Sequence, residues 1–297
     1  MIAVVGCDLQ RIIFTWCLDP LVLSDFIGAG GFWTSSEWDA GSMNLEICVD
    51  SVESAMAAER GGAQRVELCA DLLEGGITPG AGLIASVRRR IGIDIYVIVR
   101  PRGGDFCYTD LEFEVMQEEI KHAQKLGADG IVLGILDEEG RVNVDRTRDL
   151  VALARPLPVT FHRAIDMTPD LTAALADVIA TGASRILTSG GAPNAKLGMQ
   201  AIAELVEAAQ GRIAIMPGGG VSAETVAEIA ELTQATEFHS SARTAFGSPV
   251  RFRKQGMAMG DIRGREYRRF TVREESVRAL ASALQRLGEE RATVRLS

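Results

Sequence analysis

The strongest constraint on the fold is a regular alternation between short β-rich runs and helical runs, which begins at residue 44 and repeats eight times. Each connection between successive β-rich runs is long enough for a helix, and none has the pattern of a hairpin, so the strands are expected to pair in parallel. The predicted strands are Leu45–Asp50, Arg65–Ala70, Ile93–Arg100, Gly130–Leu136, Val159–Ile165, Arg185–Ser189, Arg212–Pro217 and Glu237–Ser241. The clearest predicted helices are Ser51–Arg60, Leu111–Leu126, Leu171–Thr181, Ala195–Ala209 and Ala223–Leu232.

Eight strand–helix units over about 250 residues predict an α/β fold of one kind, the (β/α)₈ TIM barrel with parallel strands. An open doubly wound sheet is the alternative, but that fold usually has about five or six strands. In a TIM barrel the functional residues lie at the carboxyl ends of the strands, so those ends are where candidate site residues are sought.

The first 42 residues have no sustained period, although they contain all three tryptophans, Trp16, Trp33 and Trp38. We interpret residues 1–42 as a poorly patterned N-terminal extension that is disordered or not native, with Met43 as the natural start. The alternative is a genuine helix that covers the bottom of the fold. Residues 43–297 are predicted to form a single TIM-barrel domain.

The amino-acid composition argues against several classes of function. The formal net charge is −9 and no basic stretch dominates, which argues against nucleic acid as a partner. Three histidines are too few for a binuclear hydrolase site with four histidine ligands, and the scarce lysines leave few candidates for a Schiff base. The five cysteines form no disulfide framework, so a reduced, cytoplasmic protein is expected. The apolar residues 12–33 are interrupted by Asp19, Pro20 and Asp25, so neither a signal peptide nor a membrane anchor is predicted.

The C-terminal part has the opposite charge balance. Residues 242–272 are predicted to be a long connection, and from residue 251 onward there are 12 basic and 6 acidic residues. This basic stretch is either a solvated face or subunit contact, or a surface for an anionic partner.

Charged side chains gather near the carboxyl ends of the predicted strands. In the first strand, alternation places Glu46 and Cys48 opposite Leu45 and Ile47, and the apolar face is expected to meet the helices. The charged set expected to converge inside the barrel, with candidate catalytic roles, is Glu46, Glu67, Arg100, His162, Arg163, Asp166 and His239. Burying such charges is costly unless they pair or meet a ligand. The set is therefore either an ionic network that closes the barrel or a ligand or catalytic site.

Glycine-rich loops follow the sixth and seventh predicted strands. Glycine lets backbone N–H groups approach an anion, and the last loops of TIM barrels often bind phosphate. The candidate ligand-binding residues are Ser189, Gly190, Gly218, Gly219, Gly220 and Ser240. We expect them to bind phosphate or carboxylate; tight turns without a ligand are the alternative.

Two cysteines occupy equivalent inward positions on neighbouring predicted strands. Cys48 and Cys69 are therefore expected to place their sulfur atoms close together. Thiolates suit Cu(I) better than they suit Mg²⁺ or Ca²⁺, although buried cysteines often only fill space.

These segments together resemble the CutC copper-homeostasis family over residues 44–288. The matching segments are Leu45–Cys48, Arg65–Ala70, Glu74–Pro79, Arg100–Tyr108, Val159–Arg163, Leu187–Gly190, Phe238–Ala242, Arg253–Met259 and Glu266–Leu287. The resemblance implies a cytoplasmic TIM barrel, a homo-oligomer, a role in copper tolerance and Cu(I) binding through cysteines. It therefore implies Cys48 and Cys69 as the metal ligands.

Two functions remain open. The first is cytoplasmic copper homeostasis with Cu(I) bound by the two cysteines. The second is an enzyme that acts on a small anionic substrate, phosphorylated or carboxylated, at the barrel mouth. In the enzyme, the carboxylates act as general acid or base, the two inward histidines carry protons and the arginines bind the anion. Neither function involves nucleic acid or a membrane.

Overall fold

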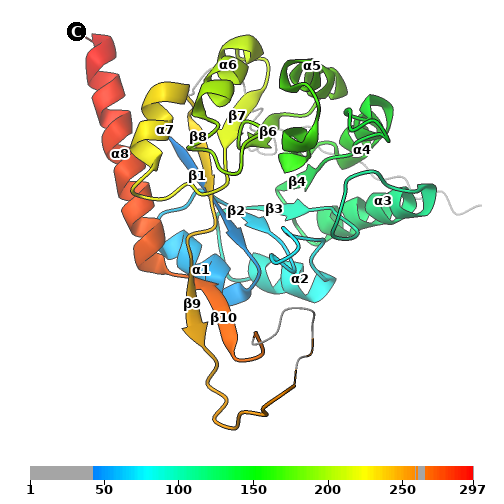
Figure 1. Ribbon diagram of the computed structural model, residues 1–297, viewed down its shortest axis with the longest axis vertical. Coiled ribbons are helices and arrows are strands. Elements are labelled where there is room, and N and C mark those ends of the chain that lie inside the picture. Colours follow the sequence, from blue (N-terminus) through cyan, green and yellow to red (C-terminus); the bar gives the residue numbers. More distant parts are fainter. Residues whose placement is uncertain (1–42, 258, 260–264, 297) are drawn as a thin grey trace, which may run out of the picture. The chain divides into compact units, whose positions relative to one another are not determined.

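Eight parallel strands form the centre of the protein, whose computed structural model describes residues 43–257, 259 and 265–296. The strands are β1 Asn44–Val49, β2 Arg65–Leu68, β3 Asp94–Ile98, β4 Gly130–Leu133, β5 Val159–Phe161, β6 Arg185–Thr188, β7 Ala214–Pro217 and β8 Glu237–Ser240. Their order is β7-β6-β5-β4-β3-β2-β1-β8, and the two outer strands β7 and β8 pack against each other, so the sheet wraps into a nearly closed barrel (Figure 1). The predicted TIM barrel is confirmed.

Helices surround the strands on the outside (Figure 1). They are α1 Val52–Arg60, α2 Ala81–Arg88, α3 Asp110–Lys125, α4 Val144–Ala154, α5 Leu171–Thr181, α6 Met199–Ala209, α7 Val226–Thr233 and α8 Glu274–Leu296. Capping residues in the local sequence determine where several of these helices begin. Thr109 and Glu112 form a capping box at α3, and the Asp170 carboxylate accepts two backbone N–H groups at α5.

The barrel has two apolar layers, one on each side of the sheet. Leu45 and Ile47 point outward into the large core between strands and helices. Inside the barrel lies a smaller cluster that contains Cys48, Cys69 and Tyr96. The alternation predicted for the first strand is therefore confirmed, and it turns the two thiols toward the barrel interior.

The fifth predicted strand is too long. The strand β5 ends at Phe161, and residues Arg163–Met167 form a short 3₁₀ helix, η1, rather than continuing the strand to Ile165. The His162 ring begins η1 by accepting the backbone N–H of Ala164. This turn places Arg163 and Asp166 over the mouth of the barrel, where an extended chain would have carried them away from it.

Residues 242–272 contain a pair of strands that was not predicted. The antiparallel strands β9, Arg243–Gly247, and β10, Arg268–Val272, form a hairpin beside the barrel (Figure 1). Arginines stack on the hairpin's aromatic rings, with the Arg269 guanidinium 5.4 Å from the centre of the Phe246 ring. The prediction of a long connection did not include this pairing, because 20 residues separate β9 from β10 and conceal the hairpin pattern.

The predicted extension, residues 1–42, lies outside the described residues, so the domain boundary at residue 43 stays a prediction. Among the helices of the described residues, none combines the length and the apolar character that crossing a membrane requires.

Candidate functional site

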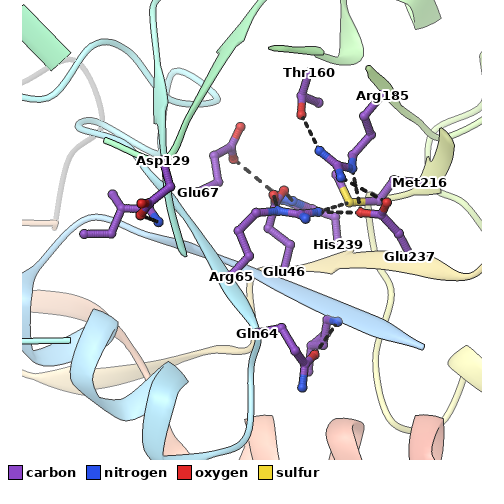
Figure 2. Close-up of polar contacts among 12 residues, drawn as sticks. Glu46, Gln64, Arg65, Glu67, Asp129, Thr160, Arg185, Met216, Glu237 and His239 are labelled. Carbon is purple, nitrogen blue, oxygen red and sulfur yellow. Dashed lines mark hydrogen bonds and ion pairs between the residues drawn. The ribbon is translucent and has the colours of Figure 1, made fainter. Parts of the chain in front are cut away.

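An ionic layer of two arginines and two carboxylates is buried inside the barrel (Figure 2). The Arg65 guanidinium donates to the carboxylates of Glu46 and Glu237, the second at 2.7 Å. The Arg185 guanidinium donates to Glu237 at 2.5 Å, and both arginines lie over the Tyr96 ring, 4.7 and 5.4 Å from its centre. All four charged side chains are buried. Two cations and two carboxylates therefore compensate one another, which makes their burial tolerable.

Only Glu46 of this layer belongs to the predicted site. Arg65 and Glu237 share strand faces with predicted residues, so the period-two pattern that selected Glu67 and His239 could also have selected them. Arg185 is the first residue of the sixth strand, and as a charged residue inside a predicted strand it could have been selected in the same way. The charged set was predicted to be either an ionic network that closes the barrel or a ligand site. The first description fits this ionic layer.

Above the ionic layer, Glu46 positions His239. The Glu46 Oε1 atom is 2.7 Å from Nδ1 of His239, whose Nε2 atom is 3.8 Å from the Glu67 carboxylate. Burial alone would raise the pKa of Glu46, but the charge of Arg65 and the bond to His239 bring it below the usual range. Burial would lower the pKa of His239, yet its bonds to Cys48 and Glu46 raise it well above the usual value. His239 is therefore an imidazolium between carboxylates.

The two inward thiols contact each other next to this histidine. The Sγ atoms of Cys48 and Cys69 are 3.6 Å apart. A hydrogen bond from Cys69, with further help from His239, lowers the pKa of Cys48 to about 5, whereas burial and that same bond raise the pKa of Cys69. Burial and the neighbouring Cys48 raise the pKa of Glu67. Cys48 is thus a thiolate at neutral pH.

A cavity of about 380 Å³ opens at the carboxyl ends of the strands. Its lining includes most of the predicted site residues: Cys48, Glu67, Arg100, His162, Arg163, Asp166, Gly219, Gly220 and His239. Apolar side chains that were not predicted complete the wall, among them Ile98, Phe106 and Leu187. The remaining predicted residues lie behind or beside this wall: Glu46, Cys69, Ser189, Gly190, Gly218 and Ser240. The fold thus brings the thiols and the charged mouth residues to one cavity.

Asp166 binds the donors of the glycine-rich loop after β6. Its carboxylate accepts the backbone N–H groups of Ser189 and Gly191 at 3.0–3.1 Å, the Thr188 hydroxyl at 2.5 Å and the Arg163 Nε–H at 2.8 Å. The Gly190 N–H donates to the Thr188 hydroxyl. The N–H groups that were expected to bind phosphate are therefore occupied by the Asp166 carboxylate.

Ser240, the other serine predicted to bind a ligand, also forms its hydrogen bond within the protein. The Ser240 hydroxyl, which is buried, donates to the backbone carbonyl of Val221 at 2.6 Å. Of the glycines after β7, Gly218 donates its N–H to the Thr188 carbonyl, while Gly219 and Gly220 line the cavity.

His162 gives the protein a defined pH response. Burial and the nearby Arg100 charge lower its pKa from 6.5 to about 3, so the unfolded chain binds more protons than the folded chain between these pH values. Stability is therefore expected to fall as the pH drops below 6.5, by up to about 1.4 kcal/mol per pH unit from this group. Asparagine keeps an acceptor for the Ala164 N–H and cannot titrate. Urea unfolding of wild type and His162→Asn from pH 6.5 to 4 should show the shallower decline in the variant, and equal slopes would contradict the assignment.

Fold and site together define a class: a TIM-barrel protein with a buried thiol pair beside a histidine and a mouth cavity lined by two arginines. The chain belongs to the CutC family, whose family model matches residues 43–244. The copper homeostasis protein cutC homolog of Mus musculus is 50% identical over 231 residues, which are 77% of this chain and 85% of that protein. The family protein CutC of Chromobacterium violaceum is 48% identical over 242 residues, 82% of this chain and 98% of that protein.

Solved structures agree with this membership. A CutC protein from Streptococcus agalactiae is 34% identical, covers 67% of this chain and 98% of its own, and superposes with a TM-score of 0.64. An aldolase, QR15, reaches a TM-score of 0.53 at 16% identity and covers 69% of this chain and 92% of its own, a likeness of fold alone.

Proposed function

We propose that this protein binds Cu(I) through the sulfur atoms of Cys48 and Cys69 and serves cytoplasmic copper homeostasis. The observation that carries the proposal is the pair of sulfur atoms 3.6 Å apart, one of them in the wall of the mouth cavity. The mouse relative, half of whose matched residues are identical, is named for copper homeostasis, which supports the same role here.

The chemistry of the donor set suits a soft cation. Thiolates select Cu(I) over Mg²⁺ and Ca²⁺, and Cys48 is already a thiolate. Copper binding displaces the Cys69 proton, because a thiol must lose its proton to become a ligand. The ligand atoms of Cys48, Glu67 and His239 lie within 4.8 Å of one another, so His239 is near enough to bind the same ion once its ring loses the Nε2 proton.

A cytoplasmic location and a homo-oligomeric state belong to the same proposal. The three cysteines of the described residues, Cys48, Cys69 and Cys107, are free thiols, as a reducing compartment maintains them.

The test is an anaerobic Cu(I) titration of the full chain against a bicinchoninate competitor. Wild type is expected to withdraw one Cu(I) from the competitor, and Cys48→Ser and Cys69→Ser are expected to lose that ability, since a hydroxyl is a poor ligand for a soft ion. The matched control is Cys107→Ser, a half-buried cysteine of the loop before α3, which should bind like wild type.

Equal affinity in wild type and the two core variants would refute the copper site. Because two sulfur atoms with an imidazole and a carboxylate also suit Zn²⁺, the titration is repeated with Zn²⁺ in competition. Displacement of Cu(I) by equimolar Zn²⁺ would likewise contradict the proposal.

For the second hypothesis, an enzyme, the structure favours only the binding of a ligand. Asp166, one candidate base, is tied to the backbone and hydroxyl donors of the β6 loop. Glu46, another, is held between Arg65 and His239 in the barrel interior. Neither of these two carboxylates is free to exchange a proton with a substrate. The third candidate, Glu67, does line the cavity, but it is one carboxyl group beside the thiols, and we propose no reaction for it.

A further inference from the structure

Two residues that line the mouth cavity each have a buried hydrogen-bond donor that no described residue satisfies. The donors are Nε of Arg100 and Nε2 of His162. Both side chains lie against one ring, since the Arg100 guanidinium is 5.0 Å from the centre of the Phe106 ring and the His162 ring is 4.9 Å from it. Buried donors without acceptors are uncommon in folded proteins because they lose hydration without compensation.

The proton of His162 lies on the unsatisfied nitrogen. Its Nδ1 atom accepts the backbone N–H of Ala164 at 3.2 Å, which requires a lone pair there. The ring is neutral at physiological pH, because burial lowers its pKa to about 3. Nε2 therefore carries the hydrogen and is a donor that needs an acceptor from outside the chain.

Arg100 adds a positive charge that lacks a counter-ion. Its guanidinium donates to the carbonyl oxygens of Glu74, Gly76 and Gly104 at 2.5–2.9 Å, and within the described part of the chain no carboxylate forms an ion pair with it. The side chain is only 5% exposed. A buried charge of this kind is costly unless an opposite charge arrives.

Arg163 lies across the same cavity. Its Nε and Nη2 atoms donate to Asp166 and Ser189, and its Nη1 atom has no hydrogen bond within the described residues. Gly219 leaves room for that nitrogen, since a Cβ at Gly219 would be 3.3 Å from Nη1. A third donor is therefore available at the cavity wall.

We propose that the mouth cavity binds a small organic carboxylate, held by the charge of Arg100 and by the donors of His162 and Arg163. Its carbon skeleton lies against the apolar wall that includes Phe106, Met167 and Leu187. A carboxylate fits better than a phosphate because the backbone N–H groups of the β6 loop, which would cradle phosphate, are occupied by Asp166. The volume of about 380 Å³ suits a small metabolite. This site does not depend on the copper proposal.

The test uses the copper-free full chain and three probes at constant ionic strength: butyrate, the neutral analogue butyramide, and inorganic phosphate. Butyrate is expected to raise the Tm and give a saturable calorimetric titration, whereas butyramide and phosphate give neither. Replacing His162 with asparagine keeps an acceptor for the Ala164 N–H and leaves no donor at the position of the ring Nε2, because the asparagine side chain is shorter, and it should weaken butyrate binding about tenfold. Arg163→Gln should weaken it by a similar factor, while Arg141→Gln, an exposed arginine outside the cavity, should bind like wild type.

Three results would overturn the proposal: equal binding of butyrate and butyramide, tighter binding of phosphate than of butyrate, or unchanged butyrate affinity in both His162→Asn and Arg163→Gln. Circular dichroism establishes that each variant is folded, and either variant alone suffices if the other is not. Because no copper is present, failure of the Cu(I) titration leaves this result intact, and failure here leaves the copper site intact.

Discussion

Replacing Arg65 with methionine lowers the free energy of unfolding by about 3–5 kcal/mol, the expected cost of leaving a buried charge without its partner. Arg65 bridges two carboxylates, Glu46 and Glu237, inside the barrel (Figure 2). Methionine fills much of the same volume, so the decrease in the free energy of unfolding arises from the missing charge and not from a cavity. Without Arg65, only Arg185 and His239 remain to balance the two carboxylates. Urea unfolding at pH 7 measures the change.

The matched control is Arg60→Met, which removes an arginine that pairs with Glu274 at the surface. That pair is solvated, so its loss is expected to cost less than about 1 kcal/mol. The double variant Arg65→Met/Glu46→Gln should be less destabilised than the sum of its single variants, because it removes both members of a pair. A loss for Arg65→Met no larger than that of Arg60→Met would show that the ionic layer does not stabilise the barrel.

Gly198→Ala is expected to destabilise the protein by about 3 kcal/mol, the upper end of the usual cost of overpacking. A Cβ on Gly198 would lie 1.9 Å from the Ser189 carbonyl oxygen, and a backbone atom has little freedom to move away. The φ angle of Gly198 is −96°, which alanine adopts easily, so the effect is purely steric. Displacing Ser189 would also loosen the donors that hold Asp166. Urea unfolding measures the loss.

Gly82→Ala supplies the contrast. This residue lies in α2, has no atom within 4 Å of the added Cβ, and is exposed. Alanine there is expected to stabilise the protein by about 0.5–1 kcal/mol through its higher helix propensity. If Gly198→Ala proved as well tolerated as Gly82→Ala, the contact between the Gly198 turn and the β6 loop would not be the constraint that the structure indicates.

Periodicity predicted the barrel because each strand–helix unit carries its own signal. The first strand shows how much this local pattern specifies: Leu45 and Ile47 pack outward, while Glu46 and Cys48 face inward, as alternation requires. The prediction went wrong where a local signal was ambiguous. The run after Phe161 reads as strand, but the His162 side chain caps a 3₁₀ turn instead.

The thiol pair could also be predicted from sequence, whereas the roles of the charged residues could not. Cys48 and Cys69 share the inward side of neighbouring strands, so alternation predicts that both thiols point into the barrel. The register pairs Cys48 with Glu67, and Cys69 follows directly after the end of β2, where its sulfur reaches that of Cys48. Asp166 and Arg163, by contrast, depend on the course of η1 and the β6 loop, which no period describes. Likewise, no sequence pattern shows that Arg100 donates to three carbonyl oxygens and forms no ion pair with a described residue.

The sequence by itself determined an eight-unit barrel, the inward face of the first strand, and a pair of adjacent thiols. Only the tertiary structure decided which charged side chains form ion pairs with one another and which, like Arg100, form none among the described residues. Glu46 and His239 are 193 residues apart and become neighbours because closure of the barrel pairs β1 with β8. Alternation sets the direction of a side chain, which is a local property of the strand. Its partner is set by register and loop geometry across the whole barrel, and in this protein these separate a buried ionic layer from an open mouth lined by Arg100 and Arg163.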